Sequence, residues 1–309
     1  MKDNALRKTF EGKRILVTGG TGSIGSEIVR KLTEYNPAQI RIYSRDESKH
    51  FFLQHELERK NVNENIRYLI GDIRDRDRLD RAMQDIDIVF HAAALKHVPF
   101  CEYNSFEAIQ TNVNGTQNVI DFALKYNIEK LVAISTDKAV YPNTIMGITK
   151  LLMERMVISA HNYVGNATTK FSVVRFGNVL NSRGSVIPLW KEQVKAGGPV
   201  TVTDKKMKRF FMTIPDAVNL AFYATSMMLG QEIVSFKMRE ENIYKLATKT
   251  IKEYGAGKKI RIKITGARER EKMVEHLFTQ EEKEYMIEKK QFYVILPNKE
   301  LYKERINTY

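Results

Sequence analysis

Side chains able to exchange protons gather in residues 135–150, which read STDKAVYPNTIMGITK. Asp137 and Lys138 stand next to each other at the end of the β-rich run KLVAIST, and Tyr141 and Lys150 follow. A positioned acid beside a positioned base can remove one proton from a substrate and protonate its leaving group. In open α/β sheets, ligands bind at the carboxyl ends of strands. The stretch therefore predicts proton-transfer chemistry at a strand end.

The segments that must position this stretch alternate between strand and helix patterns. KRILVTGG reads as a buried strand, SIGSEIVRKLTEY has apolar residues at helical spacing, and QIRIYSRDE alternates like a second strand. Together they have the size of a βαβ crossover. Further strand patterns are IRYLIGD, DIVFHAAA, KLVAIST and KFSVVRFGN, with helical patterns between them. The sequence predicts an α/β fold, a Rossmann-type doubly wound parallel sheet with helices on both faces.

The alternating pattern loosens after the strand pattern KFSVVRFGN, where short elements and the Gly-Gly-Pro at 197–199 follow. We therefore predict an NADP-binding Rossmann domain over residues 10–182 and, over residues 183–309, mainly a smaller C-terminal α/β substrate-binding lobe. This interpretation leaves room for later segments to cross back and join the core sheet.

The composition excludes several functional classes. No apolar run approaches the about 20 residues that a membrane helix needs, and the first residues lack a signal peptide's apolar stretch, so we expect a cytoplasmic protein with no integral membrane segment. The lone Cys101 agrees with a reducing compartment, and the six scattered histidines predict no metal site. The net charge of +13 is spread along the chain, so we expect a solvated surface and no nucleic-acid partner.

Glycines after the first strand predict a phosphate site. Gly19, Gly22 and Gly25 in TGGTGSIG open a predicted helix, whose free amides can bind a diphosphate. The expected contacts on this turn are Gly19, Thr21, Gly22, Ser23, Ile24 and Gly25. The context of strand, turn and helix predicts a dinucleotide cofactor.

The end of the second strand should choose between the two nicotinamide dinucleotides. An acid there binds the ribose hydroxyls of NAD, whereas an arginine pairs with the 2′-phosphate of NADP. Ser44, Arg45 and Lys49 favour NADP, although Asp46 leaves NAD open. The other predicted cofactor contacts, at later strand ends and in the small-residue run HAAALK, are Asp72, Ile73, Ala92, Ala93, Ala94, Lys96, Asn112, Ser135 and Lys150. His91 and His97 are interpreted as structural.

These motifs together resemble the extended short-chain dehydrogenase/reductase superfamily. Within it, TDKAVYPNTIMGITK, RFGNVLNSRGSVIP and KRFFMT are similar to the UDP-N-acetylglucosamine 4,6-dehydratases of capsule and O-antigen synthesis, especially the inverting branch. Most superfamily members carry a YxxxK pair on the helix after this strand. Here Met146 stands in the tyrosine slot, four residues before Lys150, and has no proton to exchange. Some members of the inverting branch have the same methionine.

The resemblance implies roles for the residues at the strand end. The chemistry would be oxidation at C4 of the sugar, loss of water across C5 and C6, and return of the hydride to C6. Lys138 would be the C5 base, Asp137 the acid for the C6 hydroxyl, and Thr136 a hydrogen-bond partner of the C4 oxygen. Lys150 would hold the nicotinamide ribose. We expect burial and Lys150 to depress the pKa of Lys138, and Asp137 to raise it.

The resemblance also implies a UDP-N-acetylglucosamine or related UDP-HexNAc substrate and a homo-oligomer, either a dimer or a hexamer. The predicted substrate contacts are Lys96, Met146, Asn178, Val186, Thr201, Thr203, Arg209, Arg268 and Glu271. The run ARERE departs from the pattern of the family, with Arg270 where a glycine is common.

Two other functions fit parts of the sequence. A UDP-sugar 4-epimerase would share the cofactor and the C4 oxidation without losing water. A non-catalytic NADP-binding regulator or nucleic-acid partner would explain Met146 and the basic charge. The sequence leaves open the C5 stereochemistry of the product, a further C3 epimerisation, and the group that takes the C4 hydroxyl proton: Asp137, Lys138 and an ordered water are all candidates.

Overall fold

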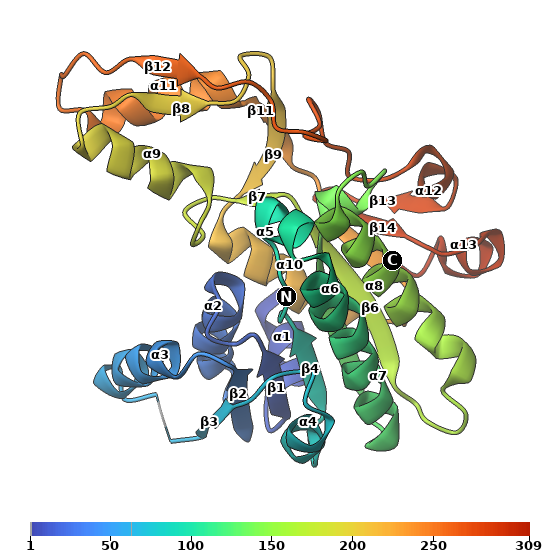
Figure 1. Ribbon diagram of the computed structural model, residues 1–309. Coiled ribbons are helices and arrows are strands. Elements are labelled where there is room, and N and C mark those ends of the chain that lie inside the picture. Colours follow the sequence, from blue (N-terminus) through green and yellow to red (C-terminus); the bar gives the residue numbers. More distant parts are fainter. Residues whose placement is uncertain (1, 63) are drawn as a thin grey trace.

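One large sheet dominates the computed structural model, which describes residues 2–62 and 64–309 (Figure 1). Its strands lie in the order β13-β14-β10-β6-β5-β4-β1-β2-β3. The run from β3 to β10 is parallel, whereas β14 pairs antiparallel with both β10 and β13. The strands are Arg14–Thr18 (β1), Gln39–Ser44 (β2), Ile66–Ile70 (β3), Ile88–His91 (β4), Lys130–Thr136 (β5), Lys170–Phe176 (β6), Ile233–Phe236 (β10), Met286–Glu288 (β13) and Phe292–Ile295 (β14). The predicted doubly wound α/β fold is confirmed.

Helices cover both faces of this sheet because its central strands are apolar on both sides. Each face buries its own hydrophobic cluster. The helices of one face are Lys2–Phe10 (α1), Ser23–Leu32 (α2), Glu47–Arg59 (α3) and Ile214–Met227 (α10). Those of the other are Arg76–Met83 (α4), Gly115–Lys125 (α7) and Ile145–Ser159 (α8).

The strand order reverses direction at β1. The chain runs from β1 outward through β2 and β3, then crosses back to β4 and continues through β5 and β6. A crevice therefore opens beyond the carboxyl ends of β1 and β4, where such sheets bind their ligands. The strand end of β5, which carries the proposed acid and base, borders the same crevice.

Segments after β6 build a smaller lobe beyond the large sheet, seen at the upper left of Figure 1. Its core gathers around the fully buried Trp190. The lobe consists of Asn178–Val179 (β7), Val186–Lys195 (α9), Val200–Val202 (β8), Lys208–Met212 (β9), Arg239–Asn242 (β11), Ile243–Tyr254 (α11) and Ile262–Ile264 (β12). Because β10, β13 and β14 belong to the large sheet and α10 packs on one of its faces, the chain after 182 contributes to both parts. The domain boundary at 182 and 183 stays a prediction.

Short elements complete the chain. They are Thr33–Tyr35 (η1), Val98–Tyr103 (α5), Ser105–Ile109 (α6), Gln110–Asn114 (η2), Asp137–Ala139 (η3), Ala160–Tyr163 (η4), Gln280–Glu284 (α12) and Lys299–Arg305 (α13). Among the described residues, the helices are all too short or too polar to cross a bilayer.

A buried arginine fixes the C-terminal segment to the sheet. Arg175 of β6 is fully buried, and its guanidinium contacts Glu154 of α8 at 2.7 Å and Glu282 of α12 at 2.9 Å. It also donates to the carbonyl of Leu277 at 2.8 Å. These contacts anchor the segment just before α12, which lines the candidate site described below.

Replacing this arginine should destabilise the protein strongly. Arg175→Met leaves two buried carboxylates without their counter-charge, so we expect the free energy of unfolding to fall by about 3–5 kcal/mol. The control Arg30→Met breaks a partly exposed pair with Glu56 and should cost about 1 kcal/mol or less. Urea denaturation followed by circular dichroism measures both. Equal losses in the two variants would contradict the anchoring role of Arg175.

Candidate active site

The acid and base at positions 137 and 138 meet because β5 ends there. The backbone leaves the strand at Thr136 and turns through η3, which the Thr136 hydroxyl caps by accepting from the Lys138 amide. Asp137 is fully buried, and its Oδ1 lies 2.9 Å from Nζ of Lys138. Thr136 Oγ1 donates to the same oxygen at 3.0 Å. In a continuing strand, these two successive side chains would point to opposite faces of the sheet.

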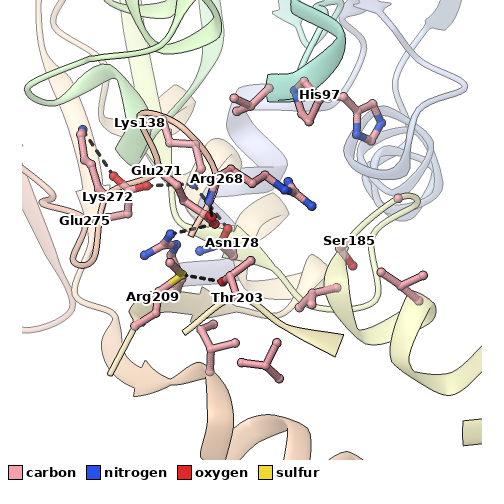
Figure 2. Close-up of a pocket in the computed structure, with 18 of the residues that line it drawn as sticks. His97, Lys138, Asn178, Ser185, Thr203, Arg209, Arg268, Glu271, Lys272 and Glu275 are labelled. Atoms are coloured by element: carbon pink, nitrogen blue, oxygen red, sulfur yellow. Dashed lines mark hydrogen bonds and ion pairs between the residues drawn. The ribbon is translucent and has the colours of Figure 1, made fainter. Parts of the chain in front are cut away.

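Two groups from distant parts of the chain also surround Lys138. Its Nζ lies 3.6 Å from Oε1 of Glu275 and 3.4 Å from Oδ1 of Asn178 (Figure 2). Burial opposes the ammonium charge, but the carboxylates of Asp137 and Glu275 outweigh it and raise the pKa of Lys138 above its ordinary value. The expected lowering by burial and the expected raising by Asp137 are both present, and the net shift of the Lys138 pKa is upward. The sequence showed the adjacent acid but not Glu275.

Tyr141 faces away from this pair. Its hydroxyl accepts a hydrogen bond from the amide of Gln280 at 2.7 Å, and its ring packs edge-on against His276. Met146, in the tyrosine slot of the YxxxK pattern, is buried beside Cys101. Unlike the other predicted substrate contacts, Met146 does not line the cavity described below. Neither side chain can act on a group bound beside Lys138 in this geometry.

Lys150 and His91 lie buried behind the strand ends. Lys150 Nζ donates to the carbonyl of Ile134 at 2.7 Å, and burial lowers its pKa to about 8. His91 lies between the hydroxyls of Thr18 and Thr116, at 2.8 and 3.0 Å. Burial, together with the charge of Lys150, lowers the pKa of His91 to about 3, so its ring is neutral at pH 7. His91 thus joins β1, β4 and α7, whereas Lys150 titrates near physiological pH.

The turn between β1 and α2 leaves no room for side chains at two of its glycines. Gly19 has a φ of +65°, and a Cβ there would lie 2.7 Å from the amide of Ala93. A Cβ on Gly25 would lie 2.4 Å from the carbonyl of Gly19. After Gly22, α2 begins without a side-chain cap or an acid in its first turn, so its N-terminal amides can bind an anion. The turn, which also carries Thr21, Ser23 and Ile24, fits the diphosphate of a dinucleotide.

The end of β2 carries the charges predicted to choose the cofactor. Arg45 is half exposed and lies 3.5 Å from Asp72, which Arg74 also holds at 2.7 Å. Asp46 caps α3 by accepting from the amide of Lys49 at 3.0 Å, and it forms an ion pair with the side chain of the same lysine. These hydrogen bonds to Lys49 lower the pKa of Asp46. The carboxylate of Asp46, which the sequence offered as a ligand for the ribose of NAD, therefore caps α3.

The loop after β4 is fixed by a side chain from the π-helical turn η2. Asn112 accepts from the amide of Leu95 at 2.8 Å and donates to the carbonyl of Leu95 and the hydroxyl of Thr149, both at 3.0 Å. Such π turns frequently occur at functional sites. Asn112 thereby positions the backbone of the predicted cofactor contacts on this loop, Ala92, Ala93, Ala94 and Lys96.

The remaining predicted cofactor contacts differ in their surroundings. Ser44 Oγ lies 2.8 Å from Thr21 Oγ1, which ties the end of β2 to the glycine turn. Ile73 is buried in the core and would collide with a Cβ on Gly115. The hydroxyl of Ser135 is buried and has no hydrogen-bond partner among the described residues. A bound molecule could supply that partner.

A cavity of about 490 Å³ lies between the sheet and the lobe (Figure 2). The predicted substrate contacts on its wall are Lys96, Asn178, Val186, Thr201, Thr203, Arg209, Arg268 and Glu271. Lys138 and Glu275 line the same cavity. The structure therefore brings Lys138 of the strand-end pair to the lobe residues, which lie up to about 130 positions away in the sequence.

Charged side chains of the lobe fix one another at this wall. Arg209 Nη2 lies 3.4 Å from Oε1 of Glu271, whose other oxygen accepts from the amide of Arg268 at 3.0 Å. The side chain of Arg209 is only 9% exposed, whereas Arg268 is exposed. Two guanidinium groups at one wall can bind phosphate oxygens, since each offers paired donors.

Sequence reasoning missed several residues of this site. Glu275 is 5% exposed, and Lys272 lies 3.4 Å from its Oε2 while donating to the carbonyl of Val140 at 2.7 Å. His97 packs against Gly184, where a Cβ would meet its ring at 2.4 Å. No spacing in the run AREREKMVEHLF distinguishes Glu275 from its exposed neighbours. Only the folded chain brings it to Lys138.

The family described as "Polysaccharide biosynthesis protein" matches this chain over residues 15–297. The chain belongs to this family. The protein is thus an extended short-chain dehydrogenase/reductase of polysaccharide biosynthesis.

Individual relatives show which activities are named for similar proteins. The chain is 41% identical to a UDP-N-acetylglucosamine 4,6-dehydratase (inverting) of Campylobacter jejuni, covering 94% of this chain and 84% of that one. It is also 41% identical to a UDP-glucose 4-epimerase of Rickettsia canadensis, covering 88% and 80%. The X-ray structure of Pen from Bacillus thuringiensis superimposes with a TM-score of 0.90 at 44% identity, covering 93% and 90%. Both dehydratases and epimerases are therefore among its relatives.

Removing the second carboxylate should lower the pKa of Lys138. In Glu275→Gln one of the two charges that favour the ammonium form is gone, so the titration of Lys138 should move to lower pH than in the unaltered protein. NMR of protein labelled with ¹³C-lysine measures it, with Lys138→Gln identifying the resonance.

The control Glu288→Gln removes a carboxylate that pairs with Lys237 and should leave Lys138 unchanged. An identical Lys138 titration in Glu275→Gln and the unaltered protein would refute the contact as the cause of the raised pKa.

Proposed function

We propose that this protein is an NADP-dependent UDP-N-acetylglucosamine 4,6-dehydratase of the inverting kind. Its product would be a UDP-4-keto-6-deoxy-HexNAc, formed by oxidation at C4, loss of water across C5 and C6, and hydride return to C6. The observation that carries the proposal is the ion pair of Asp137 and Lys138, 2.9 Å apart, in which Lys138 lines the cavity that Arg209 and Arg268 also line and Asp137 lies buried behind it. The Campylobacter jejuni relative named for this activity supports it.

One proton shift inside the pair would make both catalysts. The proton moves from Nζ of Lys138 to Oδ1 of Asp137, leaving a neutral amine and a carboxylic acid. The amine takes the proton from C5, and the acid protonates the C6 hydroxyl, which departs as water. Both groups then have their starting charges. A sugar that displaces water from the pair favours the neutral form, because desolvation penalises charged groups.

The raised pKa of Lys138 fits this scheme better than it fits a permanently neutral base. In the free protein the ammonium of Lys138 lies beside the carboxylates of Asp137 and Glu275. Oδ1 of Asp137 is within hydrogen-bond distance and can accept its proton. Inversion requires that C5 then receives a proton from the opposite face of the ring. That proton balances the one released from the C4 hydroxyl.

The glycine turn, the uncapped α2 and the small residues after β4 support a nicotinamide dinucleotide as cofactor. When bound, the nicotinamide supplies the acceptor for the C4 hydride and returns it to C6. NADP is favoured because Asp46 is engaged as the cap of α3, whereas Arg45 is half exposed at the end of β2. Lys150 would bind the nicotinamide ribose.

The UDP half of the substrate would lie toward the lobe. Arg209 and Arg268 would bind its phosphates, and Thr201 and Thr203 the uridine. Asn178 lies between this wall and the catalytic pair, because its side chain contacts Lys138 and also donates to the carbonyl of Phe210 at 3.1 Å. The hexose would then extend from the phosphates to Lys138.

A homo-oligomer forms part of the same proposal. Phe100, Tyr103 and Phe106 on the neighbouring helices α5 and α6 are between 66% and 90% exposed. Large apolar side chains gathered on a surface are typical of interfaces. A second copy of the chain would cover them.

The products of an incubation with UDP-N-acetylglucosamine test the function. We expect a sugar lighter than the substrate by one water, formed without added NADP if the cofactor is retained, and no lasting increase in reduced-nicotinamide absorbance, since the hydride returns. Mass spectrometry and absorbance measure these outcomes. A product of unchanged mass would instead support a 4-epimerase, the activity named for the Rickettsia relative. NMR of product formed in deuterated water would give the C5 configuration.

The choice of cofactor can be tested at Arg45. Arg45→Met removes the cation proposed for the 2′-phosphate, while Asp72 keeps its partner Arg74. We expect NADP⁺ affinity to fall about tenfold or more, because a hydrogen bond to a charged group contributes about 1.5–3 kcal/mol. NAD⁺ affinity should stay unchanged. Calorimetric titration of both dinucleotides measures the ratio, and a parallel loss of both affinities would refute the assignment.

A further inference from the structure

A short loop joins the glycine turn to the wall of the cavity. Residues 182–185, here called the strap, lie between β7, which ends at Val179, and α9, which begins at Val186. The amide of Arg183 donates to Oγ of Ser23 at 3.0 Å, and its guanidinium donates to the carbonyl of Thr21. Lys96 Nζ donates to the carbonyl of Arg183 at 2.9 Å. The strap is thus bound to both loops that border the cofactor crevice.

The guanidinium of Arg183 is distinguished from the nearby cations by its partners. Arg45 lies by Asp72, and Lys49 forms an ion pair with Asp46. Among the described residues, Arg183 forms no ion pair with a carboxylate, and its guanidinium hydrogen bond goes to a neutral carbonyl. The charge of Arg183 contributes to lowering two neighbouring pKa values. The pKa of Asp46 is lowered mainly by Lys49, and the pKa of Lys96 is lowered mainly by burial. In the part of the chain that the structure describes, Arg183 therefore stands beside the phosphate turn without a direct ion pair.

The other end of the strap faces the substrate cavity. Gly184 and Ser185 line that cavity together with Lys96 and His97. Gly184 adopts a φ of +70° and packs so closely on His97 that a Cβ would lie 2.4 Å from the ring. The hydroxyl of Ser185 is buried, without a hydrogen-bond partner among the described residues, at the uncapped start of α9. One side of the strap therefore borders the proposed cofactor site, and the other side lines the substrate cavity.

We propose that Arg183 is a cofactor-binding residue whose guanidinium pairs with the diphosphate of the dinucleotide, so that the strap closes over the cofactor. This inference rests on the dinucleotide cofactor of the proposed function, but not on the sugar or the reaction. Arg183 would exchange the neutral carbonyl of Thr21 for anionic oxygens, and hydrogen bonds to charged acceptors are about twice as strong. The Lys96 and Ser23 contacts hold the strap in place for this exchange.

A strap closed over the dinucleotide would slow its release between turnovers. A dehydratase that returns its hydride has no need to release the dinucleotide between turnovers. Because Gly184 and Ser185 also line the sugar-nucleotide cavity, a substrate there holds the strap from the other side. Binding at the two subsites is then reciprocally favourable.

Binding measurements without any sugar test the assignment. Calorimetric titration with NADP⁺ and NAD⁺ compares the unaltered protein with Arg183→Met, and with Arg59→Met as a control at an exposed arginine near the end of α3. We expect Arg183→Met to weaken both dinucleotides by about tenfold or more, and Arg59→Met to change neither. The diphosphate is common to both cofactors, so the two losses should be equal.

Three results would overturn the assignment. Unchanged affinity in Arg183→Met removes Arg183 from the cofactor site. A loss confined to NADP⁺ moves it to the 2′-phosphate and refutes the diphosphate contact. If the unaltered protein binds neither dinucleotide, this inference and the proposed cofactor fail together, whereas normal binding with an epimerised product leaves this inference intact.

Limited proteolysis gives a readout that needs no substitution. Trypsin cleaves after arginine, and the strap presents the exposed Arg183 followed by Gly184. Saturating NADP⁺ should slow cleavage after Arg183 several-fold relative to cleavage after Arg59, as followed by mass spectrometry of the fragments. Equal rates at Arg183 with and without NADP⁺ would show that the strap does not close over the cofactor.

Discussion

The contact between Asp137 and Lys138 is the interaction on which the rest of the site depends. A fully buried carboxylate is costly unless a counter-charge and hydrogen bonds surround it. Lys138 and Thr136, the last residue of β5, supply them to Oδ1, whereas Oδ2 has no hydrogen-bond partner among the described residues. The ammonium in turn needs a second carboxylate and an amide, and these come from Glu275 and Asn178. One buried acid thus requires contributions from the sheet, the lobe and the C-terminal segment.

The position of Glu275 depends on a second buried charge cluster. Arg175 of β6 holds Glu282 and the carbonyl of Leu277, which fixes the chain a few residues beyond Glu275. On the near side, Lys272 is tied to the carbonyl of Val140, next to the end of η3. The segment is therefore held at both ends by charged side chains. This explains how the carboxylate of Glu275, far along the chain, lies 3.6 Å from the amine of Lys138 in η3.

The features that the sequence predicted are local ones. The βαβ pattern, the glycine turn and the chemistry of the TDK triplet need only neighbouring residues, and the sheet and the turn have the predicted form. The raised pKa of Lys138 could be predicted only in part, because Asp137 is adjacent in the sequence whereas the second carboxylate, Glu275, is 137 residues away. Arg183 was missed for the same reason, since its contact with Thr21 spans 162 residues. Long-range charge contacts leave no periodicity in a sequence.

The adjacency of acid and base also constrains the chemistry. Two neighbours on a strand face opposite sides, so an Asp-Lys pair can serve one substrate only where the strand gives way to a turn, as it does at η3. There the charges of Asp137 and Lys138 cancel, so a proton that moves from one side chain to the other leaves the net charge of the site unchanged. A site built in this way can convert an ion pair into a neutral acid and base as water leaves. Such a site needs no additional base that is neutral before the substrate binds. This agrees with the raised pKa of Lys138 and with the buried Met146 in the tyrosine slot.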